Sequence, residues 1–199
     1  MKNILASLLL AAISMAAVVP EAMAPGKGVG VASAPLKIDV FSDFQCPSCK
    51  ASYEETLRPL KNEYVAKGKV YLVHHDFPLQ QHAYARQAAA YANAAARVNK
   101  YEEVSRELFR QQGVWSANGQ IDSILAGVLK PDELKKVRSL LTDPKILADI
   151  EQDIALGKKR NVSQTPTMIV SYKGREYPVV GNVPDYGILR KFLDDLLSK

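Results

Sequence analysis

Two groups of β-type segments are separated by about 80 residues of helical pattern. Residues 36–41 and 69–77 are rich in apolar, β-branched and aromatic residues, and two further segments of this kind flank the turn at Lys173-Gly174. A strand–helix–strand unit requires a parallel pair of strands, and a hairpin adds antiparallel strands. The sequence therefore predicts an α/β fold. We expect a mixed sheet with helices on both faces and an all-helical subdomain inserted at about residues 79–160.

Residues 1–24 predict an export signal. They begin with Lys2, continue with an apolar run, and end in the small residues Ala22-Met23-Ala24, so cleavage is expected after Ala24. The alternative is an uncleaved membrane anchor, but the apolar run is shorter than the roughly 20 residues that span a bilayer. We therefore expect a periplasmic or secreted protein with no stable membrane insertion after cleavage.

The rest of the chain divides into a short leader and one folded domain. Residues 25–34 are rich in Gly, Ala and Ser without periodicity, which predicts a flexible leader, and residues 35–199 hold the predicted strands and helices. A content of 24% charged and 47% hydrophobic residues excludes a disordered chain. The net charge of +5 comes without a long Lys/Arg run, so no nucleic-acid binding is expected.

The two cysteines of the chain occur together in Cys46-Pro47-Ser48-Cys49, directly after the first predicted strand. Pro47 is favourable at the first position of a helix, which puts Cys46 at the N-cap and Cys49 in the first turn. The helix dipole and the free N–H groups favour a thiolate there, and such sites lower a cysteine pKa from about 8.5 to roughly 3.5–7.5. Cys46 is therefore the candidate nucleophile, and Cys49 is the candidate resolving cysteine.

Three other roles for the cysteine pair compete with thiol chemistry. Half of a zinc site is disfavoured because only His74, His75 and His82 remain as histidine ligands, and the first two point to opposite faces of a strand. A structural disulfide that closes so short a loop would stabilise the fold weakly. Two unrelated core cysteines are disfavoured by the helix-start position and the export signal. No metal and no organic cofactor is expected.

Three segments resemble one known family. Residues 41–49 (FSDFQCPSC) are similar to the active-site segment of the DsbA-like thiol–disulfide oxidoreductases, which have a thioredoxin fold. The segment Asp76-Phe77-Pro78-Leu79, with His82 and the Ala-rich helix after it, resembles the start of the inserted helical region of that family. Thr165-Pro166-Thr167 resembles its cis-proline loop. The resemblance covers about residues 36–198 and implies a thioredoxin-like mixed sheet with an inserted all-helical subdomain.

The resemblance also implies a set of site residues and a function. Cys46 and Cys49 would carry a redox-active disulfide, and Thr165 with a cis Pro166 would bind an extended substrate chain. The residues that shape the active-site loop would be Asp43, Phe44, Pro47 and Ser48. The implied protein is an exported oxidoreductase that donates its disulfide to reduced exported proteins and is reset by a membrane redox partner. A reductase or isomerase, and a redox-silent peptide-binding module on the same scaffold, remain alternatives.

Two positions depart from the pattern of this family. Many relatives carry an acid six residues before the first cysteine, where this chain has Val40. The neighbouring Asp39 points to the other face of the strand and is expected to be solvated or to cap a helix. The strongest oxidants have His at the position of Ser48. A hydroxyl brings no positive charge, so we expect Cys46 to be less acidic, and its disulfide less oxidising, than in those relatives.

Several other residues are expected to be structural. The three histidines are interpreted as packing or capping residues, Asp43 as a turn residue, and Trp115 as a core residue of the helical subdomain. Lys158-Lys159-Arg160 is interpreted as the solvated end of a helix. Pro59 lies inside the helix that follows the cysteines and is expected to kink it.

Overall fold

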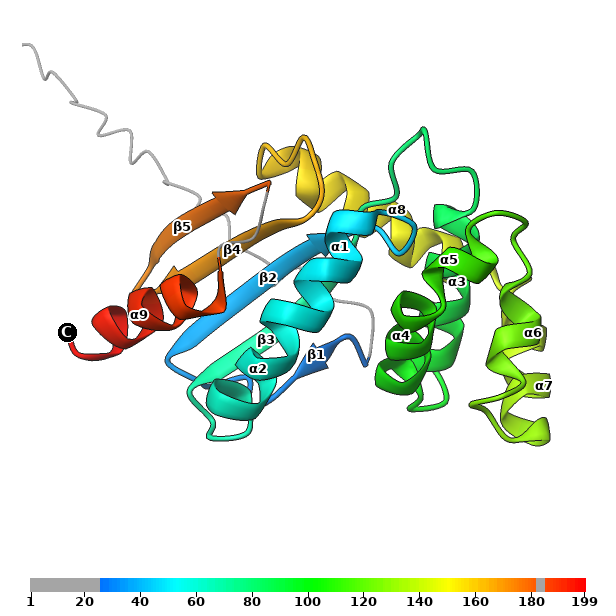
Figure 1. The fold of residues 1–199 in the computed structure, drawn as a ribbon, viewed down its shortest axis with the longest axis horizontal. Coiled ribbons are helices and arrows are strands. Elements are labelled where there is room, and N and C mark those ends of the chain that lie inside the picture. Colours follow the sequence, from blue (N-terminus) through cyan, green and yellow to red (C-terminus); the bar gives the residue numbers. More distant parts are fainter. Residues whose placement is uncertain (1–25, 182–184) are drawn as a thin grey trace, which may run out of the picture.

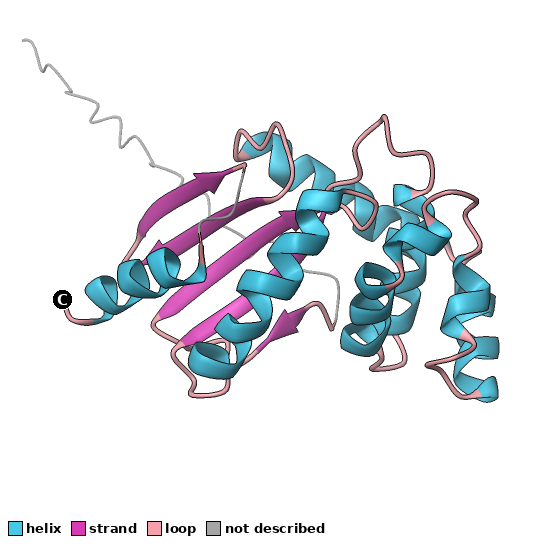
Figure 2. Ribbon diagram, viewed as in Figure 1, coloured by secondary structure: helices cyan, strands magenta, loops and turns pink. Residues whose placement is uncertain are grey.

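A five-stranded mixed sheet forms the centre of the fold (Figure 2), in the order β1-β3-β2-β4-β5. The structure is a computed structural model that describes residues 26–181 and 185–199, so the predicted signal segment lies outside the described residues. Strands β2 and β3 are parallel, and the other neighbours are antiparallel. The strands are β1 (Gly28–Val29), β2 (Leu36–Ser42), β3 (Val70–Asp76), β4 (Thr167–Tyr172) and β5 (Arg175–Val180).

Alternating residues of β2 face two different helical layers. One face carries Ile38 and Val40 into the main core, where they meet the helices that follow the cysteines and the C-terminal helix α9 (Tyr186–Leu197). The opposite face carries Phe41 against α8 (Pro144–Lys159), which crosses behind the sheet in Figure 1. The predicted helices on both faces are therefore confirmed.

Gly157 allows α8 to lie directly on the sheet. A Cβ atom built at this position would come within 2.6 Å of the Phe77 ring and 3.1 Å of the Phe41 ring. Real Cβ contacts are longer than this, so only glycine fits at the crossing point without displacement of an aromatic ring.

The helix that follows the cysteines changes its winding around Pro59. It consists of α1 (Pro47–Ser52), the π-helical turns η1 (Tyr53–Leu57) and η2 (Lys61–Val65), and α2 (Arg58–Leu60) between them. Proline has no N–H to donate to the preceding turn of an α-helix. A π-helical turn is wider, and each N–H in it donates to the carbonyl five residues back. The Arg58 N–H accordingly donates to the carbonyl of Tyr53, five residues back. Pro59 therefore acts through a change of helix type.

The chain between β3 and β4 forms the predicted helical insertion, which lies beside one end of the sheet (Figure 1). Trp115 is fully buried there, and its Nε1 donates to the Leu108 carbonyl at 2.7 Å, so its predicted core role is confirmed. Besides α8, the helices of the insertion are α3 (Ala85–Ala96), α4 (Tyr101–Arg110), α5 (Gln112–Trp115), α6 (Ile121–Leu125) and α7 (Pro131–Leu140).

The expected flexible leader is wrong for its central residues. Gly28 and Val29 form β1 and pair antiparallel with β3, and the backbone N–H of His74 donates to the Lys27 carbonyl at 3.1 Å. The Lys27 side chain is 2% exposed, and its ammonium group pairs with Asp76 and Asp153. A single buried ion cluster therefore fixes a segment whose composition is typical of a flexible chain, because composition does not report long-range charge pairing.

Candidate functional site

The cysteine pair lies where β2 ends and α1 begins. Cys46 is the N-cap residue with extended backbone, and Pro47 is the first residue of the helix, as predicted. The Cys46 carbonyl accepts hydrogen bonds from the backbone N–H groups of Cys49 and Lys50, at 3.1 and 3.2 Å. Cys46 is 7% exposed and Cys49 is 1% exposed, whereas Pro47 and Ser48 are exposed. The pair therefore reaches the surface on the Cys46 side only.

The two sulfur atoms differ in acidity. A hydrogen bond from the Cys49 thiol, assisted by the backbone N–H groups of Cys49 and Ser48, lowers the pKa of Cys46 to about 5. Burial raises the pKa of Cys49 beyond the usual thiol range, and its neighbour Cys46 raises it further. At neutral pH this geometry supports a thiolate on Cys46 beside a protonated thiol on Cys49. This is the charge distribution that a nucleophilic and a resolving cysteine require.

The Thr165–Pro166 peptide bond is cis, as expected, and it faces the cysteine pair. Cys46 Sγ lies 3.7 Å from the Thr165 carbonyl oxygen, and it can donate to this oxygen in the protonated form. Residues that are almost 120 positions apart in sequence therefore meet at one sulfur atom. Thr165 is 8% exposed, so this contact with Cys46 is buried.

Asp43 links the cysteine loop to the helical insertion, and its predicted turn role is visible in the hydrogen bonds. One carboxylate oxygen accepts from the Gln45 backbone N–H at 2.7 Å. The other accepts from the Leu79 backbone N–H at 2.8 Å and from His82 Nδ1 at 2.7 Å. The backbone N–H of Asp43 donates to Cys49 Sγ at 3.4 Å. His82 is thus a polar partner of the loop rather than a capping residue.

Two glutamines tie the same loop to the insertion, and neither was predicted as a site residue. Gln45 accepts from the Tyr84 backbone N–H at 2.7 Å and donates to the Ser116 carbonyl at 3.0 Å. Gln112 donates to the carbonyls of Phe44 and Cys46. No local sequence pattern identifies either glutamine, because their hydrogen bonds join segments more than 35 residues apart.

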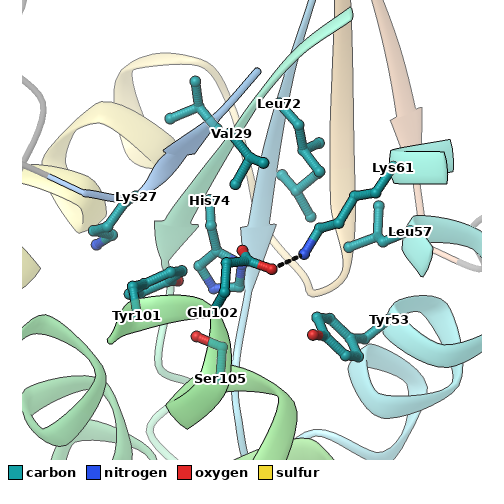
Figure 3. A pocket seen from close by; sticks show the side chains of 12 residues that line it. Lys27, Val29, Tyr53, Leu57, Lys61, Leu72, His74, Tyr101, Glu102 and Ser105 are labelled. Carbon is teal, nitrogen blue, oxygen red and sulfur yellow. Dashed lines mark hydrogen bonds and ion pairs between the residues drawn. The ribbon is translucent and has the colours of Figure 1, made fainter. Parts of the chain in front are cut away.

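A small cavity lies between the sheet, the π-helical turn η1 and α4 (Figure 3). Phe44 of the cysteine loop stacks on the ring of His74, which lines this cavity, with ring centres 5.4 Å apart. His74 Nε2 and the hydroxyls of Tyr101 and Ser105 line this cavity and have no hydrogen-bond partner among the described residues. Neither cysteine lines it. His74 therefore packs in the core, as predicted.

Asp39 is fully buried, which corrects the expectation of a solvated or helix-capping acid. Its carboxylate accepts from His75 Nε2 at 2.9 Å and from Arg160 Nη1 at 2.8 Å, and Lys37 lies at 2.9 Å. These partners hold the pKa of Asp39 well below its ordinary value despite its burial. His75 Nδ1 continues the network to Asp153 at 2.8 Å. The prediction that His75 is only a packing or capping residue is therefore incomplete.

Arg160 differs in the same way from the solvated helix end that was expected. Its guanidinium group bridges Asp39 and Glu176, so it fastens the end of α8 to β2 and β5. Strand alternation places Asp39 on the α8 face of the sheet, and Arg160 follows the last residue of α8 on that face, so each buried charge finds its partner there.

Groups of His, Cys, Asp and Glu that could hold a metal ion are absent from residues 26–181 and 185–199. None of the helices in this part of the chain combines the length and hydropathy needed to cross a bilayer.

The sequence model of the thioredoxin family matches residues 25–195 of this chain. The chain belongs to the thioredoxin family. The match includes the cysteine loop, the helical insertion and the cis-proline loop, so the predicted fold class is confirmed.

Curated relatives and solved structures agree with this assignment. A probable disulfide bond formation protein D from Bacillus cereus is 26% identical over 181 residues, which cover 87% of this chain and 79% of that protein. The Bacillus subtilis disulfide bond formation protein D is 24% identical over 179 residues, covering 85% and 76%.

Two solved structures share the fold. The alpha-DsbA1 of Wolbachia pipientis superposes with a TM-score of 0.71 at 19% identity, covering 86% of this chain and 90% of that chain. Oxidised BdbD from Bacillus subtilis gives a TM-score of 0.72 at 20% identity, covering 87% and 94%. The DsbA-like resemblance seen in the sequence is thus also found in the structure.

Proposed function

We propose that this protein is an exported thiol–disulfide oxidoreductase that donates a Cys46–Cys49 disulfide to reduced exported proteins. The observation that carries the proposal is the contrast within the cysteine pair. Cys46 caps a helix and has a pKa lowered to about 5, while the pKa of the adjacent buried Cys49 is raised. The relatives named disulfide bond formation protein D support the same chemistry.

The thiol–disulfide exchange with a substrate proceeds in two steps. A substrate thiolate attacks Cys46 Sγ, the bond between the two protein sulfurs breaks, and Cys49 leaves with the electron pair and takes up a proton. A second substrate thiolate then attacks the substrate sulfur of the mixed disulfide, and Cys46 leaves as a thiolate. The substrate is oxidised by two electrons, and the protein is left reduced. A membrane-bound thiol oxidase would reset it.

The low pKa of Cys46 favours the oxidase direction. A stable thiolate is a good leaving group and stabilises the reduced protein, which makes the disulfide more oxidising. The alternative direction, as a reductase or isomerase, is tested by the redox equilibrium with glutathione. A reduction potential near the value of about −270 mV found for thioredoxin would count against the oxidase.

Thr165 and Pro166 are proposed to bind the substrate chain beside Cys46. The support is proximity: the Thr165 carbonyl lies 3.7 Å from Cys46 Sγ. Asp43, Phe44, Pro47 and Ser48 are proposed to shape the loop. Among them, Asp43 and Phe44 are buried and hydrogen-bonded to the insertion, and the other two face outward.

Export rests on the sequence of residues 1–24, and we propose a periplasmic or secreted location with cleavage after Ala24. The mass of the exported protein tests this proposal. A mass that includes residues 1–24 would contradict it and would support an uncleaved membrane anchor instead.

Substrate trapping tests the function directly. In a Cys49→Ala variant the Cys46 thiolate can attack a disulfide of an exported protein, and no Cys49 thiol is present to displace that protein from the mixed disulfide. Exported proteins should therefore accumulate on Cys46 and be released by a reductant. The Cys46→Ser/Cys49→Ala double variant is the control and should retain nothing covalently. If Cys46→Ser still performs the biological role, the redox-silent peptide-binding module is the correct alternative.

A further inference from the structure

Gln112 is a buried residue of the helical insertion that holds two carbonyl groups of the cysteine loop. It begins α5 and is 6% exposed. Its Nε2 donates to the Phe44 carbonyl at 2.7 Å and to the Cys46 carbonyl at 3.0 Å. Both N–H bonds of this one amide are therefore used on the segment that presents Cys46.

The two carbonyl groups depend on Gln112 to different degrees. The Cys46 carbonyl also accepts from the backbone of Cys49 and Lys50, as the start of a helix requires. The Phe44 carbonyl accepts no other hydrogen bond from the part of the chain that the structure describes. A buried carbonyl without a donor costs free energy, so loss of the amide would favour rotation of the peptide group after Phe44.

The backbone at Cys46 decides where its sulfur lies. Cys46 has the extended backbone of an N-cap residue, which keeps its side chain at the N-terminus of α1, where the first-turn N–H groups and the helix dipole favour an anion. Gln112 fixes the backbone on both sides of Gln45, and therefore fixes the approach of the chain to this N-cap. Its amide hydrogens also add positive partial charge near the loop, which favours an anion.

We propose that Gln112 is a positioning residue for thiol chemistry, holding the Phe44–Cys46 backbone so that the first-turn N–H groups of α1 stabilise the Cys46 thiolate. This inference rests on the proposed function. According to this proposal, a residue of the helical insertion influences the redox equilibrium of Cys46 and Cys49, which lie at the end of the sheet.

The test compares two matched variants. Gln112→Met keeps a long side chain but removes both donors. Gln111→Met makes the same chemical change one residue earlier, where the amide donates to Glu107 and does not reach the cysteine loop. For each we measure the equilibrium with glutathione, the ultraviolet absorbance of the thiolate against pH, and the urea unfolding of the oxidised form.

We expect Gln112→Met to shift the glutathione equilibrium about tenfold toward the oxidised protein and to raise the pKa of Cys46, because the thiolate loses stabilisation. Gln111→Met should match the wild type in both. A Gln112→Met protein that unfolds more easily but keeps the wild-type equilibrium and titration would overturn the inference, since Gln112 would then be merely structural.

Three further outcomes are distinguished. If Gln112→Met does not fold, Gln112→Asn retains the amide on a shorter side chain, and an unchanged equilibrium in that variant overturns the inference. If the wild-type protein forms no Cys46–Cys49 disulfide in glutathione buffer, the proposed function fails and this inference fails with it. If the wild type forms the disulfide and Gln112→Met behaves identically, only the inference fails.

Discussion

The backbone N–H of Asp43 donates to Cys49 Sγ over 3.4 Å, so the buried sulfur is held by the same residue whose carboxylate contacts the helical insertion. Cys49 is thereby fixed from the strand side, whereas Cys46 is stabilised from the helix side. The two sulfurs are one helical turn apart and occupy different electrostatic environments, and the first prediction follows from this difference.

The alkylation rate of the reduced protein should report a single reactive thiolate. With the pKa of Cys46 at about 5, the rate should be nearly independent of pH above about 6 and should fall about tenfold per pH unit below about 4. The rate of iodoacetamide modification against pH measures this, and peptide mapping should place the label on Cys46. A rate that still rises between pH 7 and 9, as for an ordinary thiol of pKa about 8.5, would contradict the assignment.

The two neighbouring histidines of β3, His74 and His75, should differ in protonation near pH 6.5. Burial lowers the pKa of His74 well below its ordinary value, mainly because its ring lies in the core beside Phe44. Two carboxylates, Asp153 and Asp39, raise the pKa of His75 in spite of burial. NMR titration of the ring nitrogens should find His74 neutral and His75 protonated. Replacement of Asp153 by Asn should lower the pKa of His75 and leave His74 neutral.

Lys27→Met should destabilise the protein by about 3–5 kcal/mol, because it leaves the buried carboxylate of Asp76 without its cation and removes one of the two cationic partners of Asp153. Urea unfolding measures the change. The control is Arg86→Met, which breaks an exposed pair with Glu151 and should cost less than about 1 kcal/mol. Equal losses in the two variants would mean that the Lys27 cluster does not fasten the N-terminal segment.

Gly157→Ala should destabilise the protein by about 1–3 kcal/mol, although alanine is the better helix former. The new methyl group would meet the rings of Phe77 and Phe41 where α8 crosses the sheet. The matched control is Gly113→Ala, because the space around a Cβ atom at Gly113 is open. Thermal unfolding of both variants checks the prediction, and a Gly157→Ala protein as stable as the control would refute the close approach.

The parts of the fold that follow from local pattern were predictable from the sequence. Apolar alternation marks β2, and the helix-start chemistry of Pro47 places Cys46 at the N-cap. The buried charges were not predictable. Lys27 stands in a Gly-rich segment, and Asp39 alternates with apolar residues as a solvent-facing acid would. Their partners come from β3 and from the C-terminal half of α8 and its cap, and no local pattern encodes contacts across 36 to 126 residues.

The candidate site divides in the same way. Cys46 and Cys49 are found from their spacing, because four residues at a helix start bring two sulfurs together. Gln45 and Gln112 are invisible in the sequence, because an amide is common on surfaces and only its distant partner makes it functional.

The two edge strands of the sheet determine whether an extended foreign chain can add to it. β1 is only two residues long, and β5, on the other edge, carries Pro178 opposite Ile169. Proline has no N–H to offer an incoming strand, and the charged Arg175 and Glu176 begin the same strand. The edge strands β1 and β5 therefore offer few free backbone N–H and C=O groups with which a foreign strand could pair. This architecture limits amyloid-like polymerisation, and it leaves the proposed encounters with substrate chains to the Thr165–Pro166 loop and to sulfur.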